Sequence, residues 1–301
     1  MKVNRVLSCT LMLLVVSCFT ASVEAKIFST SQVNILKKEL GAKPDILLFV
    51  NFKKSRGNNY YNTVAPGFYA MFQKESSSKC FRNIPHANFD YGLVVGKLKS
   101  STSKESVLAV AQGSFNSSTL ASCLASENKM TYTTFKGVSA YRNKSGNEII
   151  LVTGPDTIIL GKGSFIKKIN PRKSTLATGS LASFSPSNHN AAMEGWKFEK
   201  GSDVSKALGY IDLGMNITVK ATVTFRDIKN LRKTKRQIDQ TRKSALFAQF
   251  LTGLTYTTSS NTLKVGYVMN SKQFNVVWSL LSAKMNLPAK KPHVTGPRII
   301  P

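Results

Sequence analysis

Met215-Asn-Ile-Thr-Val-Lys-Ala-Thr-Val-Thr-Phe225 runs directly into a long basic segment, and these two stretches together decide the fold class. In the first stretch, apolar residues alternate with polar ones, and most of the apolar residues are β-branched. A period of two predicts a strand with one buried face. In the second stretch, from Arg226 to Phe250, apolar and small residues recur at steps of three and four. That spacing predicts a helix packed on the strand.

The side of this helix that faces away from its apolar stripe is strongly cationic. We expect it to bind anions through Lys229, Lys233, Arg236 and Lys243. The alternative is a solvated outer face that only keeps the helix soluble. Because no aromatic residues alternate with the basic ones, the helix favours an acidic glycan or lipid headgroups over nucleic acid.

A strand, a polar hinge and a helix recur along the chain, at Val107–Leu124, Ile217–Leu231 and Leu263–Leu281. Strands that alternate with helices in this way predict an α+β fold. We expect two antiparallel-rich sheets with helices packed on one face, ferredoxin-like in character. The pattern has no fixed period, so a solenoid is not predicted.

Five segments follow from the composition along the chain. We predict a signal peptide at 1–25, an N-terminal α+β half at 26–170 and a crossover at 171–190, followed by a C-terminal α+β half at 191–284 and a proline-rich mobile tail at 285–301. The C-terminal half contains the basic helix.

The first segment has the pattern of an export signal. Lys2 and Arg5 precede the apolar run Val6–Val16, and Val23-Glu24-Ala25 supplies small residues at the cleavage site. We therefore expect a soluble exported chain that starts near Lys26, in the periplasm, at the cell surface or outside the cell. The alternative is Val15-Val-Ser-Cys18, which resembles a lipoprotein box and would leave the chain lipid-anchored through Cys18.

The balance of charge restricts the partners. The chain has 42 Lys and Arg against 15 Asp and Glu, a formal net charge of +27. Such a bias points to an anionic glycan, a lipid headgroup or an acidic protein, and export makes nucleic acid a weaker candidate. The alternative is that the charge reflects a proteome whose secreted proteins are generally basic.

Two cysteines, Cys80 and Cys123, remain after the leader is removed. In an oxidising compartment they predict a disulfide, which would contribute roughly 3–4 kcal/mol by restricting the unfolded chain. The alternative is two separate buried thiols. A metal site is not predicted, because the three histidines, His86, His189 and His293, are scattered along the sequence.

The order of Pro44-Asp-Ile-Leu-Leu-Phe-Val, Ala109-Val-Ala-Gln-Gly-Ser-Phe and Gly209-Tyr-Ile-Asp-Leu-Gly214, followed by the basic helix, resembles uncharacterised exported bacterial proteins built from two α/β halves. The resemblance covers most of the mature chain and rests on strand–helix junctions. It implies a layout and no known activity, so it assigns no site residues.

Signatures of catalysis or of a cofactor are missing from the sequence. Gly161-Lys-Gly-Ser164 lacks the P-loop order of Lys followed by Ser or Thr, and no Gly-x-Ser-x-Gly elbow occurs. The scattered aspartates form no recognisable pair. We expect a non-enzymatic binding or structural protein without catalytic residues or a cofactor. The alternative is a hydrolase whose site is assembled from loops.

Overall fold

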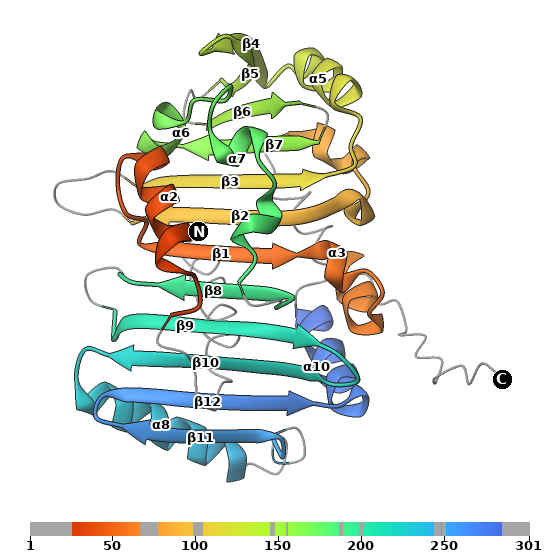
Figure 1. Ribbon diagram of the computed structural model, residues 1–301. Helices are drawn as coiled ribbons and strands as arrows, with labels where there is room; N and C mark the ends of the chain where they lie inside the picture. Colours follow the sequence, from red (N-terminus) through yellow and green to blue (C-terminus); the bar gives the residue numbers. More distant parts are fainter. Residues whose placement is uncertain are drawn as a thin grey trace.

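The computed structural model is organised around one large antiparallel sheet (Figure 1). It describes residues 26–66, 78–98, 105–144, 148–154, 156–186, 189–198, 202–243, 248 and 251–284. The strands are β1 Ile46–Asn51, β2 Phe89–Lys97, β3 Ser106–Gly113, β4 Met130–Phe135, β5 Val138–Asn143, β6 Glu148–Thr153, β7 Thr157–Lys162, β8 Ala191–Gly195, β9 Val204–Leu213, β10 Ile217–Phe225, β11 Leu254–Ser259 and β12 Thr262–Met269. Within the described residues they form a 12-stranded sheet in the order β11-β12-β10-β9-β8-β1-β2-β3-β7-β6-β5-β4.

The α+β class is confirmed, but the prediction of two sheets is wrong. Strands β1 and β8 pair antiparallel, with Leu48 opposite Met193 and Phe49 opposite Ala192, so the two halves share one continuous ladder. Separate sheets would have left both apolar strands with unpaired backbone edges. The strand order β11-β12-β10-β9 in the C-terminal half does not confirm a ferredoxin-like arrangement.

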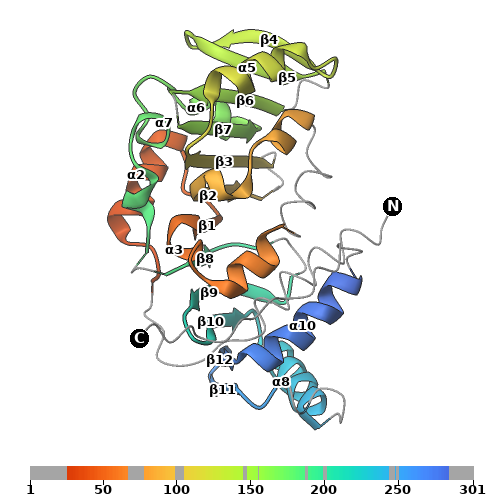
Figure 2. The same cartoon turned by 90° about the vertical axis from the view of Figure 1, so that its right-hand side faces the viewer.

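Helices cover both faces of the sheet. They are α2 Thr30–Leu40, α3 Phe52–Ser55, α5 Ser117–Ser126, α6 Ser164–Lys168, α7 Thr175–Thr178, α8 Ile228–Lys243 and α10 Ser271–Lys284, with 3-10 turns η1 Lys79–Asn83, η2 His86–Asn88 and η3 Leu181–Phe184. Figure 2 shows α2 and α7 on one side of the sheet and α8 and α10 on the other. The prediction of helices on one face is therefore wrong for the whole sheet.

Three clusters of buried side chains explain why helices cover both faces of the sheet. On one face, Leu36 of α2, Phe165 of α6 and Phe184 of η3 pack over β1, β2 and β3. On the opposite face, Leu231 of α8 and Trp278 of α10 cover the C-terminal strands, and α5 and η1 form a third cluster in the N-terminal half. The segment 171–190, predicted as a crossover, holds α7 and η3 on the first of these faces.

Strand β10 and helix α8 show how the deciding stretch folds. Every second residue of β10, from Ile217 to Phe225, is buried, as a strand with one buried face requires. The chain then turns into α8, where the carboxylate of Asp227 accepts a hydrogen bond from the backbone N–H of Asn230 at 2.9 Å. This contact satisfies one of the free N–H groups at the start of the helix.

Candidate anion-binding surface

Helix α8 presents the four predicted anion-binding residues to solvent. Leu231 is buried at 3% exposure in the core, and Ile238 packs against that core from the same side of the helix. Lys229, Lys233, Arg236 and Lys243 are all exposed. At about 100° per residue these four positions lie within an arc of about 80°, opposite Leu231 and Ile238, along roughly 21 Å of helix. They form a straight cationic row, which we call the α8 row.

The two acidic residues of this segment, Asp227 and Asp239, interact with groups outside the α8 row. Asp227 caps the helix, and Asp239 forms an ion pair with Lys235, Oδ2 to Nζ 2.8 Å, and accepts a hydrogen bond from the Tyr256 hydroxyl. The hydrogen bond from Lys235 lowers the pKa of Asp239 and raises the pKa of Lys235. Among the described residues, none forms an ion pair with a member of the α8 row. The row is therefore not neutralised from within the helix.

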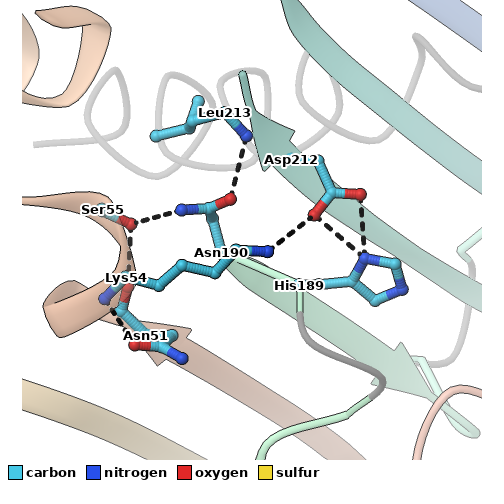
Figure 3. Close-up of polar contacts among 7 residues, drawn as sticks. All are labelled: Asn51, Lys54, Ser55, His189, Asn190, Asp212 and Leu213. Carbon is cyan, nitrogen blue, oxygen red and sulfur yellow. Dashed lines mark hydrogen bonds and ion pairs between the residues drawn. The ribbon is translucent and has the colours of Figure 1, made fainter. Parts of the chain in front are cut away.

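A second polar cluster lies where the two halves of the sheet meet (Figure 3). His189, just before β8, contacts Asp212 of β9, with Nδ1 to Oδ2 2.9 Å, and stacks on Tyr210 with ring centroids 3.6 Å apart. Lys54 of α3 lies 3.8 Å from the other carboxylate oxygen of Asp212. The sequence analysis did not predict this contact, because His189 and Asp212 are far apart in the chain.

Asn190 ties this cluster to the backbone of both halves. Its side chain donates to the buried hydroxyl of Ser55, at 2.9 Å, and accepts from the backbone N–H of Leu213, also at 2.9 Å. Its carbonyl accepts a 2.7 Å hydrogen bond from the N–H of Asn51 at the end of β1. Because every partner belongs to β1, α3 or β9, the cluster has the form of a structural clamp across the seam between β1 and β8.

Asp212 should make the fold sensitive to acid. Burial raises the pKa of Asp212, but the hydrogen bond and charge of His189, the charge of Lys54 and a hydrogen bond from the Asn190 backbone outweigh it, and the pKa is lowered overall. A carboxylate with a lowered folded pKa stabilises the fold above its unfolded pKa, and this contribution is lost as pH falls through the folded value.

We therefore expect the free energy of unfolding to decline below about pH 4, and Asp212→Asn to remove part of that decline. Urea unfolding of both proteins at neutral pH and at about pH 3 measures the difference. Glu105→Gln, at an exposed ion pair with Lys162, serves as the control. An acid decline of equal size in Asp212→Asn and in the parent would contradict this role.

Cys80 and Cys123 form a disulfide, with their Cα atoms 5.7 Å apart. It joins η1 to α5 at the cluster formed by Phe81, Leu120 and Leu124. Of the other predicted features, Cys18 and the tail 285–301 lie outside the described residues. Within the described part of the chain, no group of three or more His, Cys, Asp or Glu is arranged to hold a metal ion. In that part, no helix combines the length and apolar composition needed to cross a bilayer.

Comparison with known proteins supports the fold. No protein-family model matches the sequence, and no curated protein matches it. The chain is similar to a solved structure described as crystal form III of TP0453, with a TM-score of 0.50 and 11% identity, covering 85% of this chain and 99% of that one. For crystal form I of TP0453 the TM-score is 0.48 at 10% identity, covering 85% and 98%. At such identity the likeness to crystal form III concerns the arrangement of the chain and no activity.

Proposed function

We propose that this is an exported, non-enzymatic protein that binds an extended acidic glycan along the α8 row. The observation that carries the proposal is the row itself, in which four cations without ion-pair partners among the described residues lie along one line of a rigid helix. Carboxylate or sulfate groups repeated along a polymer match such a row better than a single small anion does, because several contacts form together.

The way α8 packs favours a mainly electrostatic contact, although Ile228 at its start is 42% exposed. Leu231 is buried in the protein core and Ile238 packs against it, so these apolar residues are not available to enter a bilayer. A helix that lies in a membrane interface needs an apolar face for that purpose. Anionic lipid headgroups are therefore the second ligand to be tested, after acidic glycans.

Export is supported by two features. The leader pattern at 1–25 is followed by a chain whose two remaining cysteines are bonded to each other, as expected in an oxidising compartment. We propose that the mature protein begins near Lys26, and the mass of the exported chain tests this.

The alternative function is that of a hydrolase. Its catalytic site would be built on the His189–Asp212 pair, because the carboxylate of Asp212 orients the imidazole of His189. Among the described residues, the partners of the His189 side chain are Asp212 and Tyr210, and neither provides a serine, threonine or cysteine nucleophile. This favours the structural role of the pair over the catalytic one.

The proposal predicts that Lys233→Gln, Arg236→Gln and Lys243→Gln together weaken heparin binding roughly tenfold at low salt, since exposed ion pairs contribute about 0.2–1 kcal/mol each. The dependence of affinity on salt should also become shallower, because fewer counterions are released on binding. Isothermal titration over a range of NaCl concentrations measures both effects, with anionic and neutral vesicles as the second ligand.

A control variant with the same change in charge distinguishes binding at the α8 row from binding that depends only on the net charge of the protein. Lys37→Gln, Lys38→Gln and Lys173→Gln remove three exposed cations on the opposite face of the sheet. This control should bind heparin nearly as the parent does. Equal losses in the two triple variants would mean that binding depends on total charge and not on the α8 row.

A further inference from the structure

Strand β4 forms one outer edge of the sheet (Figure 1 and Figure 2). Natural sheets usually protect an edge with lysine or proline in the strand, with a bulge or with a covering segment. The sequence of β4, Met130-Thr-Tyr-Thr-Thr-Phe135, contains no charged residue or proline, and β4 pairs with β5 without a register shift. In the described part of the chain, no strand lies beyond β4. The edge therefore offers a place for one more strand.

The turn after β4 fixes which backbone groups point outward. Lys136 and Gly137 have φ values of 49° and 79°, as a two-residue turn with positive φ at both positions requires. The residues that flank such a turn form a hydrogen-bonded pair, and the ladder alternates from there. Tyr132 and Thr134 therefore direct their N–H and C=O groups away from β5.

The surroundings of this edge are cationic. Arg142 of β5 lies opposite Thr131 of β4. Lys144 and Lys129 meet at the start of β4, where the Lys144 N–H donates to the Lys129 carbonyl at 3.0 Å. All three cations are exposed, and none forms an ion pair with another described residue. Because they lie outside β4, they leave its backbone groups accessible and favour a partner of negative charge.

The charged residues next in sequence are directed elsewhere. The Glu127 carboxylate accepts a hydrogen bond from a backbone N–H of η1, and Glu148 accepts one from the Asn143 side chain at 3.2 Å. Lys136, at the other end of β4, donates to the carbonyl of Lys167 at 2.8 Å, at the C-terminal end of α6. The cationic part of the edge is therefore the start of β4.

The two faces of the sheet differ at this edge. Arg142 lies on the same face as Ala140, which is buried in the cluster that includes α2 and α6. Tyr132 lies on the opposite face, where its ring meets the ring of Tyr141 edge-on with centroids 5.8 Å apart, and it is 57% exposed. An added strand would place alternate side chains on these two faces. Acidic residues match the first face, and apolar residues match the second.

We propose that β4 is a docking edge for an extended acidic peptide segment of another protein, in which acidic and apolar residues alternate. Its backbone pairs with the outward groups of Tyr132 and Thr134, and its carboxylates face Arg142 and the start of β4. A second copy of this chain does not fit, because it would bring the same cations together. The inference does not depend on the α8 row, since this partner is recognised through its backbone as well as its charge.

A synthetic peptide in which glutamate and valine alternate is the probe. Its addition should slow hydrogen exchange at the amides of Tyr132 and Thr134. Thr134→Pro removes one outward N–H and leaves the hydrogen bonds to β5 in place, so it should weaken peptide binding about tenfold in isothermal titration. Thr258→Pro makes the same change at the corresponding exposed position of β11, the other outer strand, and should bind as the parent does.

A variant that keeps the backbone of β4 unchanged tests the charge. Arg142→Gln with Lys144→Gln should weaken peptide binding several-fold and make its dependence on salt shallower, with the circular dichroism spectrum of the parent. A peptide of the same sequence with an N-methylated backbone keeps the carboxylates and loses the N–H donors, and it should bind at least about tenfold more weakly.

The α8 row is excluded by its own variant. Lys233→Gln, Arg236→Gln and Lys243→Gln together should bind the peptide as the parent does, and heparin should not slow exchange in β4. Equal binding of the methylated and unmethylated peptides would overturn the proposal, because only charge would then be recognised. So would slow exchange of Tyr132 and Thr134 before the peptide is added, since the edge would already be covered.

Discussion

Reducing the Cys80–Cys123 disulfide is expected to lower the free energy of unfolding by about 4 kcal/mol. The bond joins residues that are 43 positions apart in the sequence, so it restricts the unfolded chain to conformations in which this loop is closed. Opening the bond removes this restriction and raises the conformational entropy of the unfolded chain. Cys80 is buried at 1% exposure beside Phe81 and Leu124, so the native packing has little freedom to rearrange in compensation. The thermal midpoint should fall by roughly 10 °C in a chain of this size.

Urea unfolding of the oxidised and the dithiothreitol-reduced protein measures this effect with no change of sequence. The double variant Cys80→Ala, Cys123→Ala should behave like the reduced protein to within the cost of small cavities. If labelling shows two free thiols and the unfolding curve has not moved, the loop contributes nothing to stability and the account of this bond is wrong.

The second large effect is expected at Glu194, a carboxylate buried at 0% exposure in β8. Its Oε2 accepts hydrogen bonds from the backbone N–H groups of Ile27, at 3.1 Å, and Phe28, at 3.3 Å, while Oε1 lies 3.6 Å from Lys206 Nζ. Glu194 therefore fixes the segment just before α2 to β8, an inner strand of the sheet.

Glu194→Ala should cost about 3–5 kcal/mol, because it leaves two buried donors unsatisfied and removes one ion-pair partner of Lys206. Glu194→Gln, which keeps an acceptor oxygen, should cost less. Glu105→Ala is the surface control, since the ion pair of Glu105 with Lys162 is about half exposed and is expected to contribute less than about 1 kcal/mol. Urea unfolding that gives equal losses for Glu194→Ala and Glu105→Ala would show that the buried carboxylate does not hold the segment.

Local patterns were sufficient to predict most individual elements. The alternation from Ile217 to Phe225 predicted β10, and the three- and four-residue spacing after it predicted α8 with Leu231 facing inward. A continuous apolar run such as Ile46–Val50 is typical of a strand covered on both faces. In β1, however, only Leu47 and Phe49 are fully buried, so the strand is not equally covered on its two faces. Hydrophobic periodicity identifies an element more reliably than it identifies what packs on it.

What the sequence did not reveal was how distant elements pair. The joining of β1 to β8 depends on a contact between strands that are far apart in the chain, and no local signal encodes it. The segment Lys53–Tyr61 is polar and rich in Gly and Asn, a composition typical of loops, yet residues 59–66 are helical and Tyr60 is buried against Phe274. Tertiary packing outweighed composition at this position.

The polar cluster was missed for a related reason. The antiparallel pairing of β8 with β9 places Ala191 opposite Ile211, which brings the preceding His189 and Asn190 close to Asp212. His189 and Asn190 fall at the end of the segment 171–190, which is predicted as a crossover, and β8 begins at Ala191 directly after it. The register of β8 against β9 is the information that would have predicted this contact, since a shift of one residue in strand pairing moves every side chain to the other face.

The most direct test of the central claim is acetylation of lysines in the presence and absence of heparin, followed by mass spectrometry of the peptides. If the α8 row binds the polyanion, Lys229, Lys233 and Lys243 should be protected by heparin, while the exposed Lys37, Lys38 and Lys173 on the opposite face should react as before. Equal protection of both groups, or protection confined to the second, would contradict the claim that binding resides on α8.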